Sequence, residues 1–319
     1  MGRRRKPELL ATAASLGELQ RLADAGADAF VVGDTTFGVR VPGEFDPAAI
    51  REAVRMTRGR GIRIYAAVNN LIGNALLPGL PCYLRQLEEA GVAAVVFGDP
   101  AVLMGVREEA PGLALHWNGE MTSTSHAAAN YWGRRGATRV VLARELSLEE
   151  VAGVKANTPL EVQVQVHGMT NIYHSKRSLV SSYLEHQARS GARTELHGKP
   201  EKSGLGGGLY LMEEERPGER FPIYEDRGGT HIMSSDDLCM LENLHELMAL
   251  DIDSFKLEGL LKTEDYNEAV VRAYRKAIDA YAADPAGYRF REEWLEPIRE
   301  LQDPSRELSF GFYYKEQVY

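Results

Sequence analysis

LEVQVQVH at residues 160–167 and SFKLE at residues 254–258 are the two stretches that decide the fold. Side chains alternate between the two faces of a β-strand. Each stretch therefore has one apolar face and one polar face. The polar faces hold Gln163, Gln165 and His167 in the first stretch, and Lys256 and Glu258 in the second. Strands of this kind are typical of a (β/α) barrel that packs helices outside and holds a site inside.

Six further segments have the character of strands, and helix-like segments alternate with them. They cover residues 8–15, 29–34, 63–70, 93–100, 113–120 and 139–145. Alternating strands and helices indicate a parallel sheet. Eight such units predict an α/β fold, a TIM-like (β/α)8 barrel. A doubly wound sheet is the alternative, but it needs a glycine fingerprint after the first strand, and ATAASLGELQ has none.

The regular spacing is broken once, between the last two strands. We expect a barrel over residues 1–284 with a long insertion at about 169–235, and long loops are usually functional. The segment from Ser235 onward is predicted to be helical, which places Cys239 in a helix. Residues 285–319 are rich in aromatic side chains, so we expect a tail that packs on the barrel.

Composition limits the class of protein. The chain has 319 residues, 44% of them hydrophobic and 26% charged, which is ordinary for a soluble protein. No apolar run approaches the roughly 20 residues that span a bilayer, and no signal segment is evident, so we expect a cytoplasmic protein. The net charge of −9 argues against bulk nucleic-acid binding but permits a local basic patch. Two cysteines exclude a disulfide framework and an all-cysteine metal site.

A barrel carries its site at the carboxyl ends of its strands, where a polar cavity would bind a small ligand. The residues expected to contact substrate there are Asn69, Asn118, Arg144, Glu145, Gln163 and Gln165. The residues expected to carry acid–base chemistry are Glu120, His167, Lys256 and Glu258. Arginine suits bidentate contact with carboxylates, and histidine titrates near neutral pH. We find no metal-ligand spacing of His and carboxylates.

Simpler interpretations of the same residues stay open. His167 can be a buried, hydrogen-bonded histidine, and Glu120 can cap or turn a loop. Arg144 and Glu145 can form a salt bridge in the wall, and Lys256 and Glu258 can form an ion pair in the lumen. The insertion is locally basic, which suits phosphate contacts or merely a solvated loop. Its candidate RNA-binding residues are Lys176, Arg177, Arg189 and Arg193.

EVQVQVHGMTNIYHSKRSLVSSYL, residues 161–184, resembles the motif of the collagenase-like U-32 peptidase family. That motif runs from a glutamate through a strand to His-Gly, then Cys, Gly-Arg-Cys and a Leu-Ser pair. The resemblance extends over nearly the whole chain, through AGADAFVVGD, VVLARELSLEE and HIMSSDDLCMLENL. The ending FYYKEQVY is similar to the shorter of two paired Gram-positive members. Those members are implicated in hydroxylating the wobble uridine of tRNA to 5-hydroxyuridine, with prephenate as a required metabolite.

The resemblance implies tRNA, a longer paralogue and a small carboxylated metabolite as partners. Arg144 and Lys256 would bind the metabolite, and Arg40 and His167 would face substrate or RNA. Many members hold an iron–sulfur cluster through four cysteines. Here Asn171 and Ser178 stand at the first two of those positions and only Cys239 remains, so we expect no cluster in this chain. A collagenase-like peptidase and a non-catalytic subunit of the paralogue are the alternative functions.

Overall fold

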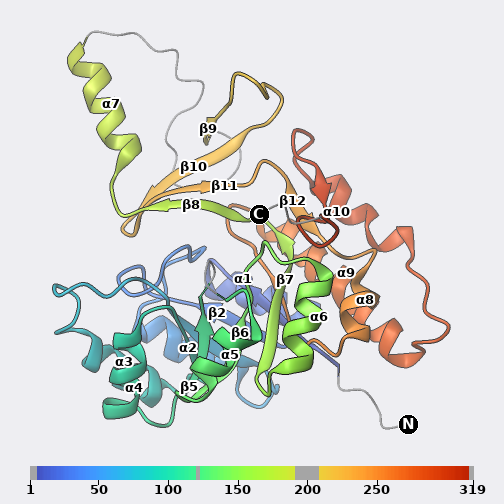
Figure 1. The fold of residues 1–319 in the computed structure, drawn as a ribbon, viewed down its shortest axis with the longest axis horizontal. Coiled ribbons are helices and arrows are strands. Elements are labelled where there is room, and N and C mark those ends of the chain that lie inside the picture. The colour runs from blue at the N-terminus through green and yellow to red at the C-terminus, as the bar shows by residue number, and fades with distance from the viewer. Residues whose placement is uncertain (1–5, 120–122, 191–207, 316–319) are drawn as a thin grey trace.

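A closed barrel of eight parallel strands forms the body of the protein, as the sequence predicts (Figure 1). The computed structural model describes residues 6–119, 123–190 and 208–315. The barrel strands pair in sequence order, and the last strand pairs with both the first and the seventh, which closes the ring. They are β1 (Glu8–Thr12), β2 (Ala29–Val32), β3 (Arg63–Val68), β4 (Ala94–Phe97), β5 (Ala114–Asn118), β6 (Ala137–Val141), β7 (Glu161–Gly168) and β13 (Ser254–Leu257).

Helices surround this barrel, and the residues at their ends explain where they begin. Asp46 accepts a hydrogen bond from the main chain of α2, and Pro47 occupies the first turn. Ser147 and Glu150 form the capping box expected at α6. The helices are α1 (Leu16–Ala25), α2 (Pro47–Thr57), α3 (Leu80–Ala90), α4 (Pro100–Glu109), α5 (His126–Gly133), α6 (Leu148–Asn157), α8 (Leu244–Ala249) and α9 (Glu264–Ala283).

The amino-terminal end of the barrel is closed by packing and a buried ion pair. Leu10, Val31 and Tyr65 belong to an apolar cluster inside the lumen. Below it, Arg139 Nη1 lies 2.6 Å from Glu8 Oε1, and the Tyr65 hydroxyl donates to the same carboxylate at 2.7 Å. The lower lumen is thus filled, so space for a ligand remains only toward the carboxyl ends of the strands.

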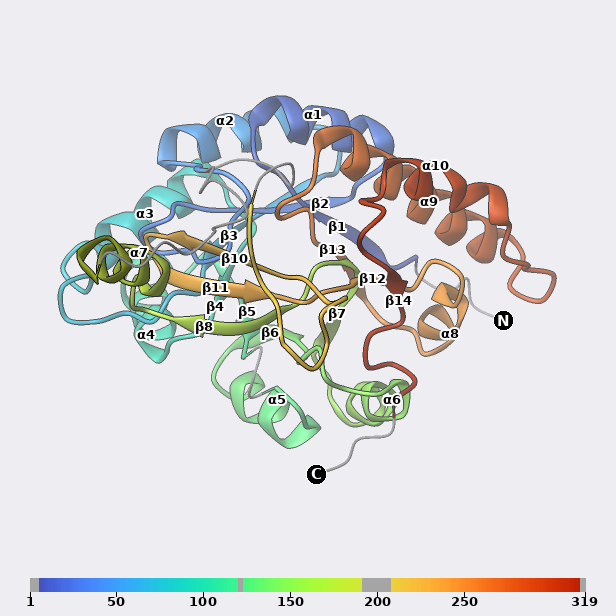
Figure 2. The same cartoon turned by 90° about the horizontal axis from the view of Figure 1, so that it is seen from above.

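The insertion forms a roof over the carboxyl ends of the barrel strands (Figures 1 and 2). Its four strands make an antiparallel sheet in the order β8-β11-β10-β9. Helix α7 projects away from the barrel at one end of this sheet. The elements are β8 (Asn171–Ser175), α7 (Leu179–Ser190), β9 (Leu209–Leu211), β10 (Phe221–Asp226) and β11 (Gly229–Met233).

The prediction of a helix from Ser235 onward is wrong for the residues before Leu244. Residues Asp237–Cys239 form strand β12, which pairs antiparallel with β7, and the helix α8 begins only at Leu244. The physical reason is a free edge: β7 pairs with β6 only as far as Gln163. Beyond that point β12 supplies the missing hydrogen bonds, and a helical periodicity cannot reveal such a distant partner.

The C-terminal segment is anchored to β12 by a buried carboxylate. Arg306 contacts both oxygens of Asp237, at 2.9 and 3.2 Å, and Lys262 and Gln302 bind the same group. The segment comprises η1 (Glu292–Trp294), α10 (Glu296–Leu301) and β14 (Leu308–Ser309), and β14 pairs in parallel with β12. The domain boundaries at 169–235 and 285 remain predictions. Within the described ranges, no helix combines the length and apolarity needed to cross a bilayer.

Candidate functional site

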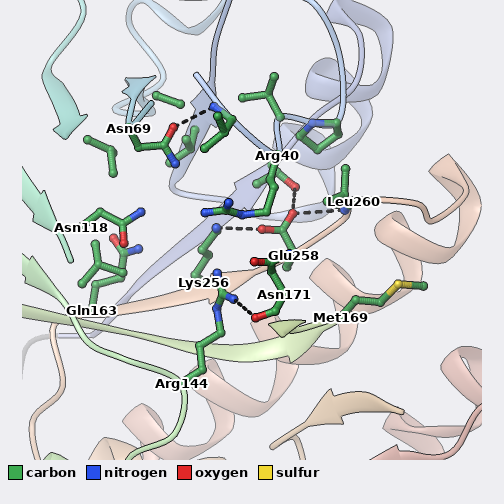
Figure 3. Close-up of a pocket in the computed structure, with 18 of the residues that line it drawn as sticks. Arg40, Asn69, Asn118, Arg144, Gln163, Met169, Asn171, Lys256, Glu258 and Leu260 are labelled. Atoms are coloured by element: carbon green, nitrogen blue, oxygen red, sulfur yellow. Dashed lines mark hydrogen bonds and ion pairs between the residues drawn. The ribbon is translucent and has the colours of Figure 1, made fainter. Parts of the chain in front are cut away.

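A small polar cavity, the mouth cavity, lies between the carboxyl ends of the strands and the roof (Figure 3). Its volume is about 40 Å³, which is room for a few water molecules. The structure gathers seven of the predicted residues around it. They are Arg40, Asn69, Asn118, Arg144, Gln163, Lys256 and Glu258. Residues far apart in sequence thus meet at one place, and their roles in binding or catalysis remain predictions.

Lys256 and Glu258 form the ion pair that their shared strand face suggests. Lys256 Nζ lies 2.8 Å from Glu258 Oε2. The other oxygen of Glu258 accepts hydrogen bonds from the Thr12 hydroxyl at 3.3 Å and from the Leu260 amide at 3.2 Å. Because the carboxylate is held from three sides, it presents the Lys256 ammonium to the cavity in a fixed position.

The end of β7 passes close to the main chain of Glu258 because Gly168 has no side chain. A Cβ at Gly168 would lie 2.1 Å from the Glu258 carbonyl oxygen, and its φ of 97° is the left-handed conformation that favours glycine. The His-Gly pair of the sequence motif therefore has a structural explanation at its glycine. Any larger residue there would push the roof away from the floor of the mouth cavity.

Arg40 reaches the mouth cavity from the loop between β2 and α2. Its φ of 55° is unusual for a residue other than glycine and costs about 1 kcal/mol or more. The loop is held because the Val39 amide donates to Asn69 Oδ1 at 3.0 Å. In Figure 3 the Arg40 guanidinium lies across the cavity, beside Lys256 and Glu258. A strained residue at this position is typical of a functional site.

Arg144 joins the barrel to its roof. It follows β6, and its Nη1 donates to the carbonyl of Asn171 in β8 at 3.2 Å (Figure 3). Asn171, Met169 and Met233 also line the mouth cavity from the roof. We did not predict these three as site residues, because strand patterns identify the barrel floor and not what folds over it. The position of Met169 and Asn171 just after β7 is the one signal in the sequence.

His167 does not face the mouth cavity, so its expected placement is wrong. Its Nε2 lies 2.9 Å from the hydroxyl of Tyr266, and its Nδ1 lies 3.4 Å from the hydroxyl of Tyr274, both on the outer helix α9. The pairing of β7 with β13 shifts by one residue, so that Val166 is extra and His167 pairs with the outward Leu257. Burial lowers the pKa of His167 to about 3. The simpler interpretation, a buried and hydrogen-bonded histidine, describes it.

Two further predicted residues do not line the mouth cavity. The Gln165 side-chain amide donates to the carbonyls of His167, Gly168 and Met169, at 3.3, 3.4 and 3.0 Å, so it shapes the turn after β7. Glu145 is exposed. The predicted Glu120 and Arg193 lie outside the residues that the structure describes.

The described basic residues of the insertion are exposed. Lys176 Nζ donates to the carbonyl of Leu71 at 2.9 Å, which ties the roof to the loop after β3. Arg177 lies at the surface, and Arg189 on α7 is 3.7 Å from Glu185. Their exposure leaves them accessible to a large anionic partner, and an RNA contact stays a prediction.

The three residues at the cluster positions do not fit an iron–sulfur cluster. Cys239 is buried in β12 beside Tyr274, and burial raises the pKa of its thiol, which disfavours the thiolate that a cluster needs. Asn171 lies in the cavity wall, and Ser178 is exposed. Among the described residues no group of three or more His, Cys, Asp or Glu side chains is placed to hold a metal ion.

Comparison with known proteins places this architecture in a family. The family model "Peptidase family U32" matches residues 14–318. The tRNA hydroxylation protein P2 of Bacillus subtilis (strain 168) is 44% identical over 316 residues, 99% of this chain and 100% of that protein. The tRNA hydroxylation protein P1 of the same strain is 31% identical over 99% of this chain and 74% of its own length. The tRNA hydroxylation protein P of Escherichia coli (strain K12) is 31% identical over 93% of this chain and 72% of its own length. This chain therefore belongs to peptidase family U32.

Proposed function

We propose that this chain promotes the hydroxylation of the tRNA wobble uridine to 5-hydroxyuridine, together with a longer family U32 paralogue. The observation that carries the proposal is the match, end to end and at 44% identity, to a relative named tRNA hydroxylation protein P2. The relative named P1 is longer, since this chain covers 74% of it. A short and a long member in one strain support a function that two paralogues share.

The mouth cavity supports a carboxylated metabolite as the small ligand. The charged side chains around it are three cations, Arg40, Arg144 and Lys256, against the single carboxylate of Glu258. Such an excess favours an anion, and two arginines suit the two carboxylates of a molecule such as prephenate. Because binding pockets for small molecules occupy roughly 300–1,000 Å³, the mouth cavity must widen when the ligand enters.

The part of this chain in the reaction is to bind and orient. Hydroxylation replaces the C5–H bond of the uracil ring by a C–OH bond, a two-electron oxidation that needs an oxidant. The residues at the cluster positions do not fit an iron–sulfur cluster, so we assign the oxidising step to the longer paralogue. In this chain Lys256 and Arg144 would fix the metabolite, and Glu258 would fix Lys256.

Peptidase activity finds little support in the described residues. A nucleophilic cysteine needs a lowered pKa and a positioned base. Burial raises the pKa of the Cys239 thiol instead, and the group beside its sulfur is the hydroxyl of Tyr274, which is not a base. His167 is enclosed between β7 and α9, where a protein substrate cannot reach it. A non-catalytic subunit remains as the alternative that the following experiment separates.

The experiment that tests the proposal is mass spectrometry of nucleosides from total tRNA. Cells that lack the gene for this chain, its longer paralogue, or both are compared with the parent. We expect 5-hydroxyuridine and its derivatives to fall in each single deletion and to return with the intact gene. Unchanged levels in the double deletion would overturn the proposal. Levels that fall only when the paralogue is missing would assign the activity to the paralogue alone.

A further inference from the structure

A second and larger pocket, the outer pocket, opens on the side of the barrel beyond Arg144. Its volume is about 660 Å³, within the range of roughly 300–1,000 Å³ that small ligands occupy. It exists because β7 leaves β6 after Gln163 and turns to pair with β12. Its wall is completed near the C-terminus by Ser309, Gly311, Phe312, Tyr313 and Lys315. The Tyr313 hydroxyl donates to the Gln165 carbonyl at 2.8 Å, which holds that wall in place.

Arg144 lines both the outer pocket and the mouth cavity. The two spaces therefore share one residue, whose guanidinium also donates to the Asn171 carbonyl. A ligand in the outer pocket would place one edge beside the metabolite in the mouth cavity. This adjacency lets one chain bind a large substrate and a small metabolite side by side and orient them.

The two spaces differ in charge. The mouth cavity has three cations against one carboxylate. The charged side chains of the outer pocket balance, three of each sign: Arg144, Arg216 and Lys315 against Glu219, Asp236 and Glu307. A balanced lining favours a neutral polar ligand over a free dianion. The mouth cavity therefore favours the anionic metabolite, and the outer pocket favours the second, neutral ligand.

Aromatic rings in the outer pocket identify the kind of neutral ligand. Phe221 and Phe312 line it, together with the serines Ser234 and Ser235 just before β12 and Ser309 in β14. The Phe312 side chain is 38% exposed, and Lys315 Nζ lies 4.9 Å from its ring centroid. An exposed ring beside hydrogen-bonding groups suits a flat heterocycle that stacks on the ring and forms hydrogen bonds along its edge.

We propose that the outer pocket holds one extruded nucleotide of the RNA substrate, with its base stacked on Phe312 and its reacting edge toward Arg144. This inference rests on the proposed function and adds to it where the base is bound. Enzymes that modify a base must take it out of its stack, and a pocket of this size and character receives it. The exposed cations Arg216 and Lys315 line the same pocket and are placed to contact the flanking phosphates.

A photo-crosslink with the wild-type protein is the direct test. An anticodon stem-loop RNA carries 4-thiouridine at the wobble position, and it is irradiated in the presence of this chain and its longer paralogue. We expect the crosslinked peptide to contain Phe312 or Phe221. A crosslink that maps only to the paralogue, or only to α7, would overturn the inference. Because no substitution is involved, the result does not depend on the folding of a variant.

A matched pair of variants gives the second test. Phe312→Ala should weaken stem-loop binding by roughly tenfold, since stacking a base on an aromatic ring contributes about that much. It should lower 5-hydroxyuridine in cells, and Phe312→Tyr should restore both. Phe310→Ala is the control, because Phe310 is also 38% exposed but does not line the pocket. Thermal melting of all three variants checks that they are folded.

The remaining outcomes separate the two proposals. If deletion of the gene lowers 5-hydroxyuridine but Phe312→Ala binds RNA and supports modification like the wild type, the nucleotide pocket is wrong and the function stands. If Phe312→Ala keeps its RNA affinity but loses the paralogue, the outer pocket is a protein-docking site instead. If deletion leaves 5-hydroxyuridine unchanged, both proposals fail.

Discussion

Lys256 Nζ lies 2.8 Å from Glu258 Oε2 at the floor of the mouth cavity, and the two residues belong to the last strand of the barrel and the turn after it. The pair is mostly buried, with side-chain exposures of 17% and 7%. A buried pair is costly to break because the remaining charge is left without compensation. The spacing of the two residues thus fixes one ammonium where a carboxylated ligand would be bound.

Breaking this pair from one side should be more harmful than removing it. Lys256→Met leaves the Glu258 carboxylate with only the Thr12 and Leu260 hydrogen bonds, so we expect a loss of about 2 kcal/mol in the free energy of unfolding. The double variant Lys256→Met with Glu258→Gln should recover part of that loss. Urea unfolding of the two single variants and the double variant measures the coupling. Strictly additive effects would show that the pair does not interact.

The carboxylate of Asp237 should be among the most important single groups for stability. Burial alone would raise its pKa, but Lys262 and Arg306 outweigh that effect and lower the pKa to about 2. Asp237→Ala would leave two buried cations unpaired, so we expect a loss of about 3–5 kcal/mol on urea unfolding.

The matched control for Asp237 is an exposed carboxylate with a similar partner distance. Asp24 lies 2.8 Å from Arg60, and its side chain is 55% exposed. Asp24→Ala should cost far less stability than Asp237→Ala, because surface pairs are weak. Equal losses for the two variants would contradict the anchoring role that we give to Asp237.

The buried His167 should make the protein less stable as the pH falls. Its pKa is about 3 in the folded chain, because burial disfavours the charged form, against about 6.5 when unfolded. At a pH below about 6.5, His167 is protonated in the unfolded chain but stays neutral in the folded chain. The stabilisation is complete above pH of about 6.5 and decreases toward the folded pKa, by about 2 kcal/mol at pH 5.

Urea unfolding between pH 7 and 5 checks this expectation, with His167→Gln as the comparison. The variant should be less stable at pH 7, since it disturbs the contact with Tyr266, but its stability should fall less steeply. A pH dependence equal to that of the wild type would mean that His167 titrates normally in the folded protein.

Basic residues of the roof should determine the salt dependence of tRNA binding. Alanine at Lys176, Arg177 and Arg189 removes three exposed cations. If all three contact phosphates, the slope of log affinity against log salt should become shallower by about 2. A triple alanine variant at the exposed Arg55, Arg85 and Arg291 is the control. An unchanged slope in the variant at Lys176, Arg177 and Arg189 would show that these residues do not contact RNA phosphates.

The barrel could be predicted because its signals are local. Each of the eight predicted strands overlaps an observed strand, since one-sided or continuous apolar runs report burial directly. The alternation over residues 254–258 also correctly placed Lys256 and Glu258 in the lumen. Six of the seven cavity residues follow from the strand pattern and the rule that a barrel holds its site at the carboxyl ends, whereas Arg40 was expected only from the family resemblance.

What the sequence did not reveal depends on partners distant in the chain. The extra residue Val166 in β7 turns His167 outward, and strict alternation cannot show a bulge. Cys239 lies in a strand because β7 has a free edge there, although its neighbours suggest a helix. The outer pocket is built from five separate segments, so no single stretch carries its signature.

The most direct measurement for the central claim is the 5-hydroxyuridine content of tRNA from cells in which variants of this chain replace the wild type. Arg144→Ala is compared with Arg55→Ala, an exposed arginine on α2 that is remote from the barrel mouth. Immunoblots confirm equal amounts of protein. If the chain acts through its barrel mouth, Arg144→Ala should lose the modification while Arg55→Ala retains it. If Arg144→Ala restores the modification as fully as the wild type, the barrel mouth is not the site of action.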